Sequence, residues 1–468
     1  MVFSSNIFVF FFLPVVLAGY FLFLRKRSHR NLFLTAVSLG FYAWGEPSFV
    51  LVMVFSIFMN WLFGLWVDKR KRAGQSKKLP LTLMCVFNLG LLGAFKYLMF
   101  VMNNLNWAFG LHMPVPEIAL PIGISFFTFQ AMSYVIDVSR GHGQVQKNFF
   151  NVCLYVSFFP QLIAGPIVRY QTVADEIDNR HETADDFAEG VWRFLTGFAK
   201  KMILANNLGL LVDTVYAYDQ SKLSVVLMWL AAFAYQMQVY YDFSGYSDMA
   251  IGLGRMFGFH FLENFNYPLL SKSVTGFWRR WHMSLGSWFR DYVYFPLGGS
   301  RVKLPRLLLN MCVVWTLTGV WHGAEWTYVL WGFLFFVLQA VERLTGLGKW
   351  MEKRPIGYLY ANLMIVMICF LIRCTNLADC AVYYGTMFGL NGAPLMNEHT
   401  LIALREFGPF VIGSVIFGLP IAAWFKNKTK MNDTLAMVIR TVFILAVTAV
   451  ALSYAVMGGY NPFIYFNF

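Results

Sequence analysis

Residues 48–67 read SFVLVMVFSIFMNWLFGLWV, an uncharged and mostly apolar run, and Asp68-Lys69-Arg70-Lys71-Arg72 follows it directly. About 20 apolar residues let a helix cross a bilayer, and basic clusters mark the cytoplasmic ends of such helices. Similar runs recur along the 468-residue chain, which is 58% hydrophobic and only 13% charged. An average soluble domain carries about 25% charged residues. The sequence therefore predicts an all-α polytopic membrane protein.

The basic clusters also predict the orientation of the helices. The cluster Arg25-Lys26-Arg27 and the cluster after residue 67 both belong in the cytoplasm, so two crossings separate them. We expect the N-terminus outside, no cleaved signal peptide, and about 11–13 membrane helices in the cytoplasmic (inner) membrane. Loops Lys349–Arg354 and Lys426–Lys430 fall on the cytoplasmic side. The predicted apolar runs are 7–24, 31–45, 48–67, 80–100, 118–138, 306–322, 326–342, 357–374, 409–425 and 434–457.

Charge and cysteine content exclude several other functions. The net charge of +13 comes largely from short loops between apolar runs, so membrane orientation explains it and nucleic acid is not expected as a partner. The six cysteines include no Cys-x-x-Cys pair and lie mostly in apolar runs. Packing therefore explains the cysteines better than a metal site or a disulfide.

The middle of the chain, 139–303, does not divide cleanly into crossings. Pro160 and Pro166 interrupt an apolar run, and the acid-rich segment Asp175–Glu189 should lie in water. The segment 263–303 is too polar to cross a bilayer but is rich in aromatic residues. Irregular backbone at membrane depth persists only where protein or a wet cavity surrounds it. We therefore expect re-entrant, cytoplasm-facing segments here, and the chemistry with them.

Two histidines stand apart from the other six. His322 ends an apolar run in Trp321-His322-Gly323-Ala324, and His282 lies in Trp278-Arg279-Arg280-Trp281-His282. A titratable group at membrane depth is costly and usually faces a functional cavity. A hydrogen-bonded core histidine is the alternative for His322, and an interfacial anchor is the alternative for His282.

Two acidic residues in apolar surroundings could orient an imidazole. Asp242 precedes Phe243-Ser244-Gly245, and Glu325 follows His322 by three residues, on the same face if the helix continues. A carboxylate can fix the tautomer of a histidine and stabilise its charged form. Capping of a helix that begins near Ser247 is an equally good role for Asp242.

Cationic and aromatic residues are interleaved over 278–303. Together they could bind a phosphorylated, purine-bearing ligand by ion pairing and stacking. Anchoring at lipid headgroups is the competing interpretation. The residues are Trp278, Arg279, Arg280, Trp281, Trp288, Arg290, Arg301 and Lys303.

Several long motifs resemble one family. They are Tyr241–Gly252 (YDFSGYSDMAIG), Asn264–Pro268 (NFNYP), Phe277–Leu285 (FWRRWHMSL), Trp321–Ala324 (WHGA) and Asn461–Phe466 (NPFIYF). Together they are similar to the membrane-bound O-acyltransferase (MBOAT) family, in its bacterial alginate O-acetyltransferase AlgI-like branch. One departure is that the segment Trp331–Phe336 lacks the histidine that many chains of this branch carry there.

The resemblance implies a single transmembrane domain over 1–468, with its core motifs at about 118–345. It implies a ring of tilted helices around a central funnel or tunnel, with His322 and His282 as catalytic residues and Trp321 in support. It also implies acetyl-CoA as the donor substrate, no bound cofactor or metal, and an extracytoplasmic SGNH-type partner protein that modifies a polysaccharide. The related D-alanyl transferase of teichoic acid synthesis, DltB, is one alternative, although its motif differs at Ser244.

Alternatives from other function classes also remain. A transporter of polysaccharide precursors fits the helix count, but we find no internal repeat of the kind that many transporters contain. A structural scaffold for an export machine leaves His322 without a role. Ser244, Ser247 and Cys312 are candidate nucleophiles with no base beside them in the sequence. We therefore expect direct transfer through a tunnel, with His322 as general base.

Overall fold

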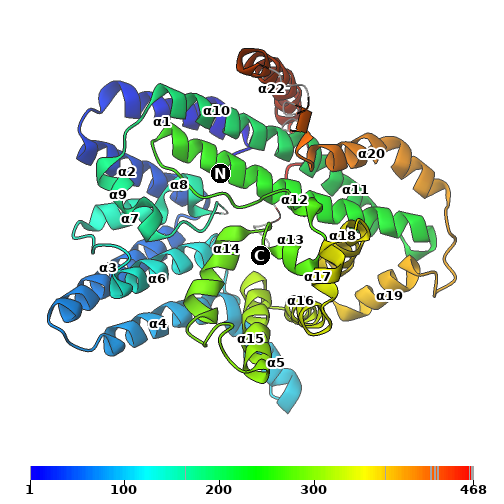
Figure 1. The fold of residues 1–468 in the computed structure, drawn as a ribbon, viewed down its shortest axis with the longest axis horizontal. Coiled ribbons are helices and arrows are strands. Elements are labelled where there is room, and N and C mark those ends of the chain that lie inside the picture. The colour runs from blue at the N-terminus through cyan, green and yellow to red at the C-terminus, as the bar shows by residue number, and fades with distance from the viewer. Residues whose placement is uncertain are drawn as a thin grey trace. The chain divides into compact units, whose positions relative to one another are not determined.

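A computed structural model shows a helical protein (Figure 1). The structure describes residues 2–163, 165–374, 376–421, 424–425, 428, 432–462 and 464, and these ranges contain helices but no β-strand. Contacts divide the chain into two compact units. The first unit comprises 1–194 and 247–262, and the second comprises 195–246 and 263–468. The all-α prediction is confirmed.

The first unit contains a continuous N-terminal helix, with π-helical turns at both ends, and a group of packed helices. Contacts join α3 to α4, α6 and α7, and α2 to α7 and α8. α10 and α12 each continue from one unit into the other. The bounds are η1 Phe8–Phe12, α1 Leu13–Ala18, η2 Gly19–Phe23, α2 Arg27–Gly45, α3 Phe49–Arg72, α4 Lys78–Leu92, η3 Gly93–Tyr97, α5 Leu98–Phe109, α6 Ile124–Arg140, α7 Phe149–Ser157, α8 Phe159–Leu162, α9 Tyr170–Asn179, α10 Ala184–Ala199 and α12 Val225–Met256.

One amide pair and a glycine hold α3 against its neighbours. Asn60 on α3 and Asn88 on α4 are fully buried and exchange hydrogen bonds of 3.0 and 2.9 Å. Such bonds stabilise helix pairs in a medium that offers no water. A Cβ at Gly64 would lie 2.6 Å from the ring of Tyr134 on α6, so only glycine permits this close approach.

The second unit contains most of α12 and the later helices. Side-chain caps define several starts: Ser273 accepts from Gly276 N, and Asn397 forms a capping box with Thr400. The remaining bounds are η4 Lys200–Ala205, α11 Asn206–Tyr216, η5 Gln220–Lys222, η6 Pro268–Leu270, α13 Val274–Trp278, α14 Met283–Phe289, η7 Arg290–Tyr294, α15 Leu304–His322, α16 Trp326–Thr345, α17 Leu347–Glu352, α18 Ile356–Cys369, η8 Phe370–Arg373, α19 Leu377–Met387, α20 Glu398–Phe417 and α22 Asp433–Val456.

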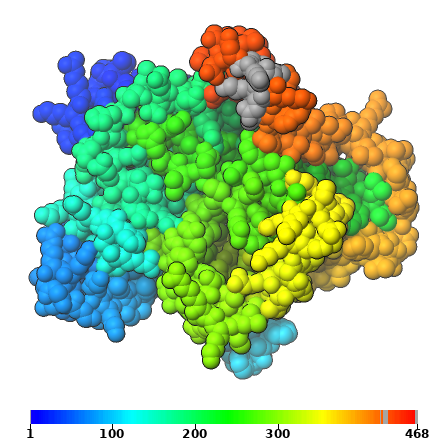
Figure 2. All heavy atoms as spheres, in the orientation of Figure 1, coloured from blue at the N-terminus to red at the C-terminus, as the bar shows by residue number. Residues whose placement is uncertain are grey.

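Seven helices among the described residues are long and apolar enough to cross a membrane. The protein is therefore a multi-pass membrane protein. The expected 11–13 crossings exceed this number, because many of the other helices are short or interrupted. The first apolar stretch, Phe8–Phe23, is a shorter helix of this kind, and 118–138 yields the 17-residue α6. The α17–α18 segment, yellow in Figure 2, lies exposed on the face shown, and α18 carries exposed Ile356 and Leu359, as expected for contact with lipid.

The predicted run 409–425 is displaced. α20 begins at Glu398, because the Asn397 capping box starts a helix that tolerates Arg405, Glu406 and Pro409. Residues 422–423 of that run lie outside the described residues, as do Lys426 and Lys430 of the predicted cytoplasmic loop. The short helix α19 was not predicted.

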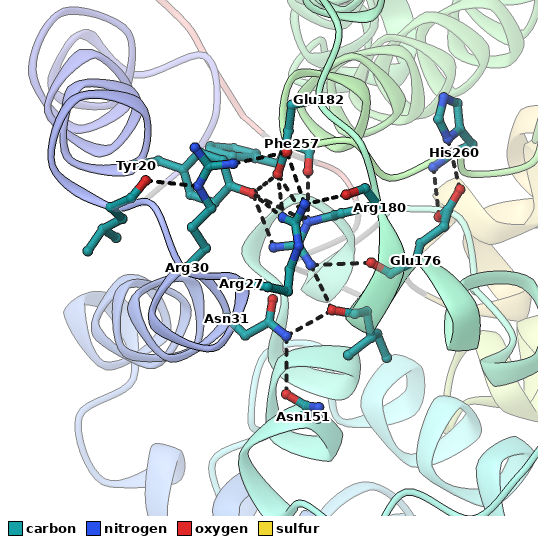
Figure 3. A network of polar contacts seen from close by, with 12 residues as sticks. Tyr20, Arg27, Arg30, Asn31, Asn151, Glu176, Arg180, Glu182, Phe257 and His260 are labelled. Atoms are coloured by element: carbon teal, nitrogen blue, oxygen red, sulfur yellow. Dashed lines mark hydrogen bonds and ion pairs between the residues drawn. The ribbon is translucent and has the colours of Figure 1, made fainter.

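The acid-rich segment Asp175–Glu189 is not simply solvated. Glu182 lies among three arginines of the first unit (Figure 3), with Arg27 Nη1 at 2.5 Å, Arg30 Nη1 at 3.0 Å and Arg180 Nε at 3.6 Å. The Tyr20 hydroxyl also donates to it. The Arg180 side chain is fully buried and donates to Phe257 O at 3.0 Å. The prediction that this whole segment lies in water is therefore wrong at its centre, where ion pairing replaces hydration.

The position of Glu182 among three arginines allows a prediction of how the stability of the fold depends on pH. Burial alone would raise the pKa of Glu182, but hydrogen bonds from Arg27 and Tyr20 outweigh it and lower the pKa from 4.5 to about 2. A carboxyl with a lowered folded-state pKa stabilises the fold above its unfolded pKa, and this contribution is lost as pH falls from about 4.5 towards 2.

We expect Glu182→Gln to lose about 2 kcal/mol at neutral pH, because charged hydrogen bonds disappear and arginines lose their counter-charge. The melting temperature in detergent should fall by a few degrees at pH 7, and the difference from wild type should shrink below pH 4.5. Asp68→Asn, which breaks the pair between half-buried Asp68 and exposed Arg72, is the matched control and should change little. A Glu182→Gln difference that is constant from pH 7 to pH 3 would contradict the assignment.

Candidate active site

Two histidines of the second unit lie beside one tryptophan. The ring centroid of Trp321 is 5.0 Å from that of His322 and 6.1 Å from that of His282. His282 and Trp321 are buried, whereas His322 is half-buried. Sequence reasoning selected all three residues, and the structure brings them together.

A close helix crossing positions His322 at the last residue of α15. A Cβ at Gly319 would lie 2.4 Å from Tyr328 O, and a Cβ at Gly332 would lie 2.4 Å from Trp315 O. These glycines therefore let the backbones of α15 and α16 touch. The crossing sets the ring of His322 edge-on against Trp331 of α16, with centroids 5.2 Å apart.

α15 ends at His322, because the next residue, Gly323, adopts an extended conformation. The helix therefore does not continue to Glu325, as a shared face with His322 would require. Glu325 is instead the exposed residue that precedes α16. Glu325 and His322 therefore do not lie on one helix face, and the prediction that they could is wrong.

His282 is held by a tight polar turn. Asn264 Oδ1 accepts from Ser284 N at 3.2 Å and from Ser284 Oγ at 2.9 Å, and it lies 3.2 Å from His282 Nδ1. His282 itself has φ +44°, a left-handed conformation that is unfavourable for a residue with a side chain. Such strain persists only where the surroundings impose it, and it concentrates at functional sites.

The turn also defines the chemical form of the His282 imidazole. A carbonyl oxygen only accepts hydrogen bonds, and the two bonds from Ser284 identify the Asn264 atom as that oxygen. His282 Nδ1 therefore carries the proton, and Nε2 is the basic nitrogen. Burial first, and then the charge of nearby His322, lower the pKa of His282 well below its usual value. The ring is consequently neutral at physiological pH.

Asp242 belongs to a different contact set. α12 runs without interruption through Ser247, so Asp242 caps no helix and that predicted role is wrong. Its carboxylate lies 2.6 Å from Lys201 Nζ and accepts from Ile464 N at 2.9 Å. The next residue, Phe243, packs edge-on against His282, with centroids 4.6 Å apart. Asp242 thus connects the end of the chain to the helix that supports His282.

The predicted cationic and aromatic residues separate into two environments. Arg279 and Arg290 are exposed, and Arg290 pairs with Asp291 at 2.8 Å. Arg280 is half-buried and donates to Asn266 O at 3.1 Å. Trp278 and Trp281 instead pack inward: Trp278 lies 4.8 Å from Phe335, and Trp281 stacks on Phe277 at 5.3 Å. The tryptophans therefore belong to the aromatic core around the histidines.

Two residues important to this geometry were not selected from the sequence. Asn264 appeared only within a motif, and Lys201 gave no signal because its partner Asp242 lies 41 positions away along the chain. Both make their contacts through tertiary structure, which no local pattern reports. Part of the terminal motif, Phe463 and 465–466, lies outside the described residues, while Asn461 bonds to Asn206 at 3.3 Å.

Comparison with known proteins identifies the family. The chain is 39% identical to the probable alginate O-acetylase AlgI of Pseudomonas aeruginosa over 93% of this chain and 83% of that protein. It is 29% identical to a peptidoglycan O-acetyltransferase of Helicobacter pylori over 100% of this chain and 98% of that protein. It is 31% identical to a teichoic acid D-alanyltransferase of Bacillus subtilis over 52% of this chain and 63% of that protein.

The family model for membrane-bound O-acyltransferases matches residues 41–378, which include both histidines, Trp321 and Asn264. The chain therefore belongs to the MBOAT family, and the protein is a membrane-bound O-acyltransferase.

Proposed function

We propose that this protein transfers an acetyl group from cytoplasmic acetyl-CoA across the membrane for the O-acetylation of an extracytoplasmic polysaccharide. One observation carries the proposal: the imidazoles of His282 and His322 flank the indole of Trp321 within the region that the family model matches. An imidazole has the pKa range that suits general acid–base catalysis of acyl transfer. The names of the AlgI and peptidoglycan relatives support acetyl as the acyl group and a polysaccharide as its destination.

In the proposed mechanism, His322 acts as the general base. The oxygen of the acceptor hydroxyl attacks the thioester carbonyl carbon while its proton passes to the His322 imidazole. The C–S bond then breaks, and the proton returns to the leaving thiolate. The half-buried His322 can meet both substrates. His282 is buried, neutral and fixed by Asn264, and in this proposal it stabilises His322 when that imidazole carries the proton.

The acceptor in this proposal is a hydroxyl presented from outside the cell, by an SGNH-type partner that passes the acetyl group to the polysaccharide. The protein would reside in the cytoplasmic membrane, because acetyl-CoA is cytoplasmic and the glycan is external. D-alanyl transfer is the second candidate. The similarity to the D-alanyltransferase covers about half of the chain, whereas the similarity to the acetylases covers nearly all of it, which favours acetyl transfer.

The decisive experiment uses purified protein with radiolabelled acetyl-CoA, with and without an extracytoplasmic partner. We expect slow release of CoA without the partner, faster release with it, and label on the partner. His322→Ala should reduce turnover at least 10²-fold, because general base assistance contributes about 10²–10⁴-fold. His112→Ala, at an exposed position between α5 and α6, is the matched control and should retain full turnover. A folded His322→Ala protein that keeps more than about a tenth of wild-type turnover would remove His322 from the mechanism.

Three arginines of the 279–290 segment provide a test of the donor site. If Arg279, Arg280 and Arg290 attract the phosphates of acetyl-CoA, their replacement by Gln should raise KM for the donor with little change in kcat. The wild-type KM should also rise with salt, because ions screen exposed charges. An unchanged KM, with altered insertion or yield only, would make these arginines headgroup anchors.

Asn264 provides a test of the role of His282. Asn264→Ala removes the acceptor that fixes the His282 tautomer, and we expect kcat to fall about tenfold or more. Asn264→Asp keeps the acceptor but adds a negative charge, which raises the pKa of His282. Because the active form is neutral, the acidic limb of the pH–rate profile should move to higher pH in Asn264→Asp. If both variants merely lose stability and the pH profile stays fixed, His282 has only a structural role.

A further inference from the structure

A buried carboxylate of the second unit, Glu342, stands in the last turn of α16. Only 4% of its surface is exposed. Burying a carboxylate is costly unless the group is paired or hydrogen-bonded. Negative charge is also unfavourable near the C-terminus of a helix, so α16 itself gains nothing from this residue. The position of Glu342 must therefore be explained by a partner outside its own helix.

That partner is the N-terminus of α13. Glu342 Oε1 accepts from Val274 N at 2.6 Å, and Oε2 accepts from Thr275 N at 2.9 Å and from Thr275 Oγ1 at 2.6 Å. The next amide, Gly276 N, donates to Ser273 Oγ at 2.9 Å. The first N–H groups of a helix have no acceptor within that helix. Glu342 therefore supplies the acceptors that the first two amides of α13 need.

α13 leads directly to one of the two site histidines. His282 follows four residues after Trp278, the last residue of α13. The connection is bonded to the helix that precedes it, because Arg280 N donates to Phe277 O at 2.9 Å. The ring of Trp281 also stacks on that of Phe277, with centroids 5.3 Å apart. A displacement of α13 is therefore carried along this connection to His282.

α16, the helix that carries Glu342, also contacts the second site histidine. Trp331, Phe335 and Glu342 follow one another at spacings of four and seven residues, which places them on one face of α16. The Trp331 ring lies 5.2 Å from that of His322. Trp278 of α13 packs against the same face, 5.5 Å from Trp331 and 4.8 Å from Phe335. One face of α16 thus contacts His322 and holds the helix that leads to the other imidazole.

We propose that Glu342 is a positioning residue, which sets the place of His282 relative to His322 by fixing the N-terminus of α13 to α16. This inference rests on the proposed function, in which both imidazoles serve acyl transfer. A carboxylate is required, because three donors converge on its two oxygens. A glutamine has one acceptor oxygen, and its NH₂ group is a donor that would face another donor. Glu342→Gln should therefore loosen the start of α13 while nearly preserving the volume of the side chain.

Hydrogen–deuterium exchange of the full-length protein in detergent tests the contact itself. We expect Glu342→Gln to speed the exchange of the Val274 and Thr275 amides about tenfold, because they lose charged acceptors. Glu352→Gln is the matched control: exposed Glu352 accepts only the Ser273 hydroxyl bond of 3.1 Å among these contacts, and the exchange of the two amides should stay at the wild-type rate. Unchanged exchange in Glu342→Gln would overturn the proposal. The measurement needs no substrate, so failure of the proposed function leaves it unaffected.

A double-mutant cycle on kcat, at saturating acetyl-CoA, tests whether Glu342 acts through His282. Glu342→Gln alone should lower kcat about 10–10²-fold, because a catalytic group displaced by about 1 Å can lose about 10²-fold in rate. In a His282→Ala protein the same substitution should change kcat by less than about twofold, because the group that it positions is absent. Glu352→Gln should leave kcat unchanged in both backgrounds.

The outcomes of the cycle separate positioning from a general structural role. An equal loss in both backgrounds, or no loss in the wild-type background, would overturn the positioning role. Full turnover in His282→Ala would instead refute the proposed function of His282, and with it a catalytic purpose for the positioning, while the exchange rates would still report the contact. If Glu342→Gln yields no folded protein, Thr275→Val removes only the hydroxyl donor, and the same comparisons apply with smaller changes.

Discussion

The backbone contact between α15 and α16 is the constraint on which the site depends. Gly319 and Gly332 leave no room for a Cβ, so the two helices cross with their main chains touching. The crossing fixes the end of α15, and the extended Gly323 then stops the helix at His322. Any larger residue at the crossing would separate the helices and move His322 away from Trp331. The position of the His322 side chain thus follows from two residues that have no side chain.

Several buried polar groups of the second unit have specific partners in the protein. Asn264 Oδ1 accepts hydrogen bonds from both Ser284 and His282, and Lys201 Nζ forms an ion pair of 2.6 Å with the Asp242 carboxylate. A buried ion pair seldom adds net stability, but the loss of one partner leaves an uncompensated charge. The Lys201–Asp242 pair therefore acts chiefly by restricting structure, since it ties Ile464 to the helix whose Phe243 packs on His282.

The sequence predicts the parts of this structure that depend on local pattern. Apolar length predicts α3, α15, α16, α18 and α22, and the rarity of histidine in apolar runs identifies His322. The sequence does not predict how the region 139–303 divides into short helices, because tertiary contacts set the boundaries of those helices. It also cannot show which side of α13 faces inward, so Trp278 and its arginine neighbours appeared to form one surface. Asn264 and Lys201 act through partners distant in the sequence, and only the fold reveals them.

The contacts of two candidate nucleophiles, Ser244 and Cys312, favour direct transfer over an acyl-enzyme. A serine or cysteine nucleophile needs a base within hydrogen-bond reach. Among the described residues, the buried hydroxyl of Ser244 makes no hydrogen bond, and the nearest recorded polar partner of Cys312 is the hydroxyl of Thr316 at 4.0 Å. Imidazoles, by contrast, are already gathered at Trp321, with one of them half-buried and able to meet a substrate. Two imidazoles beside one indole, with no base bonded to Ser244 or Cys312 among the described residues, suit proton transfer between two bound substrates. Under the proposed function, the acceptor hydroxyl would come to His322, so a partner protein would act by controlling access from outside and not the turnover of a covalent intermediate.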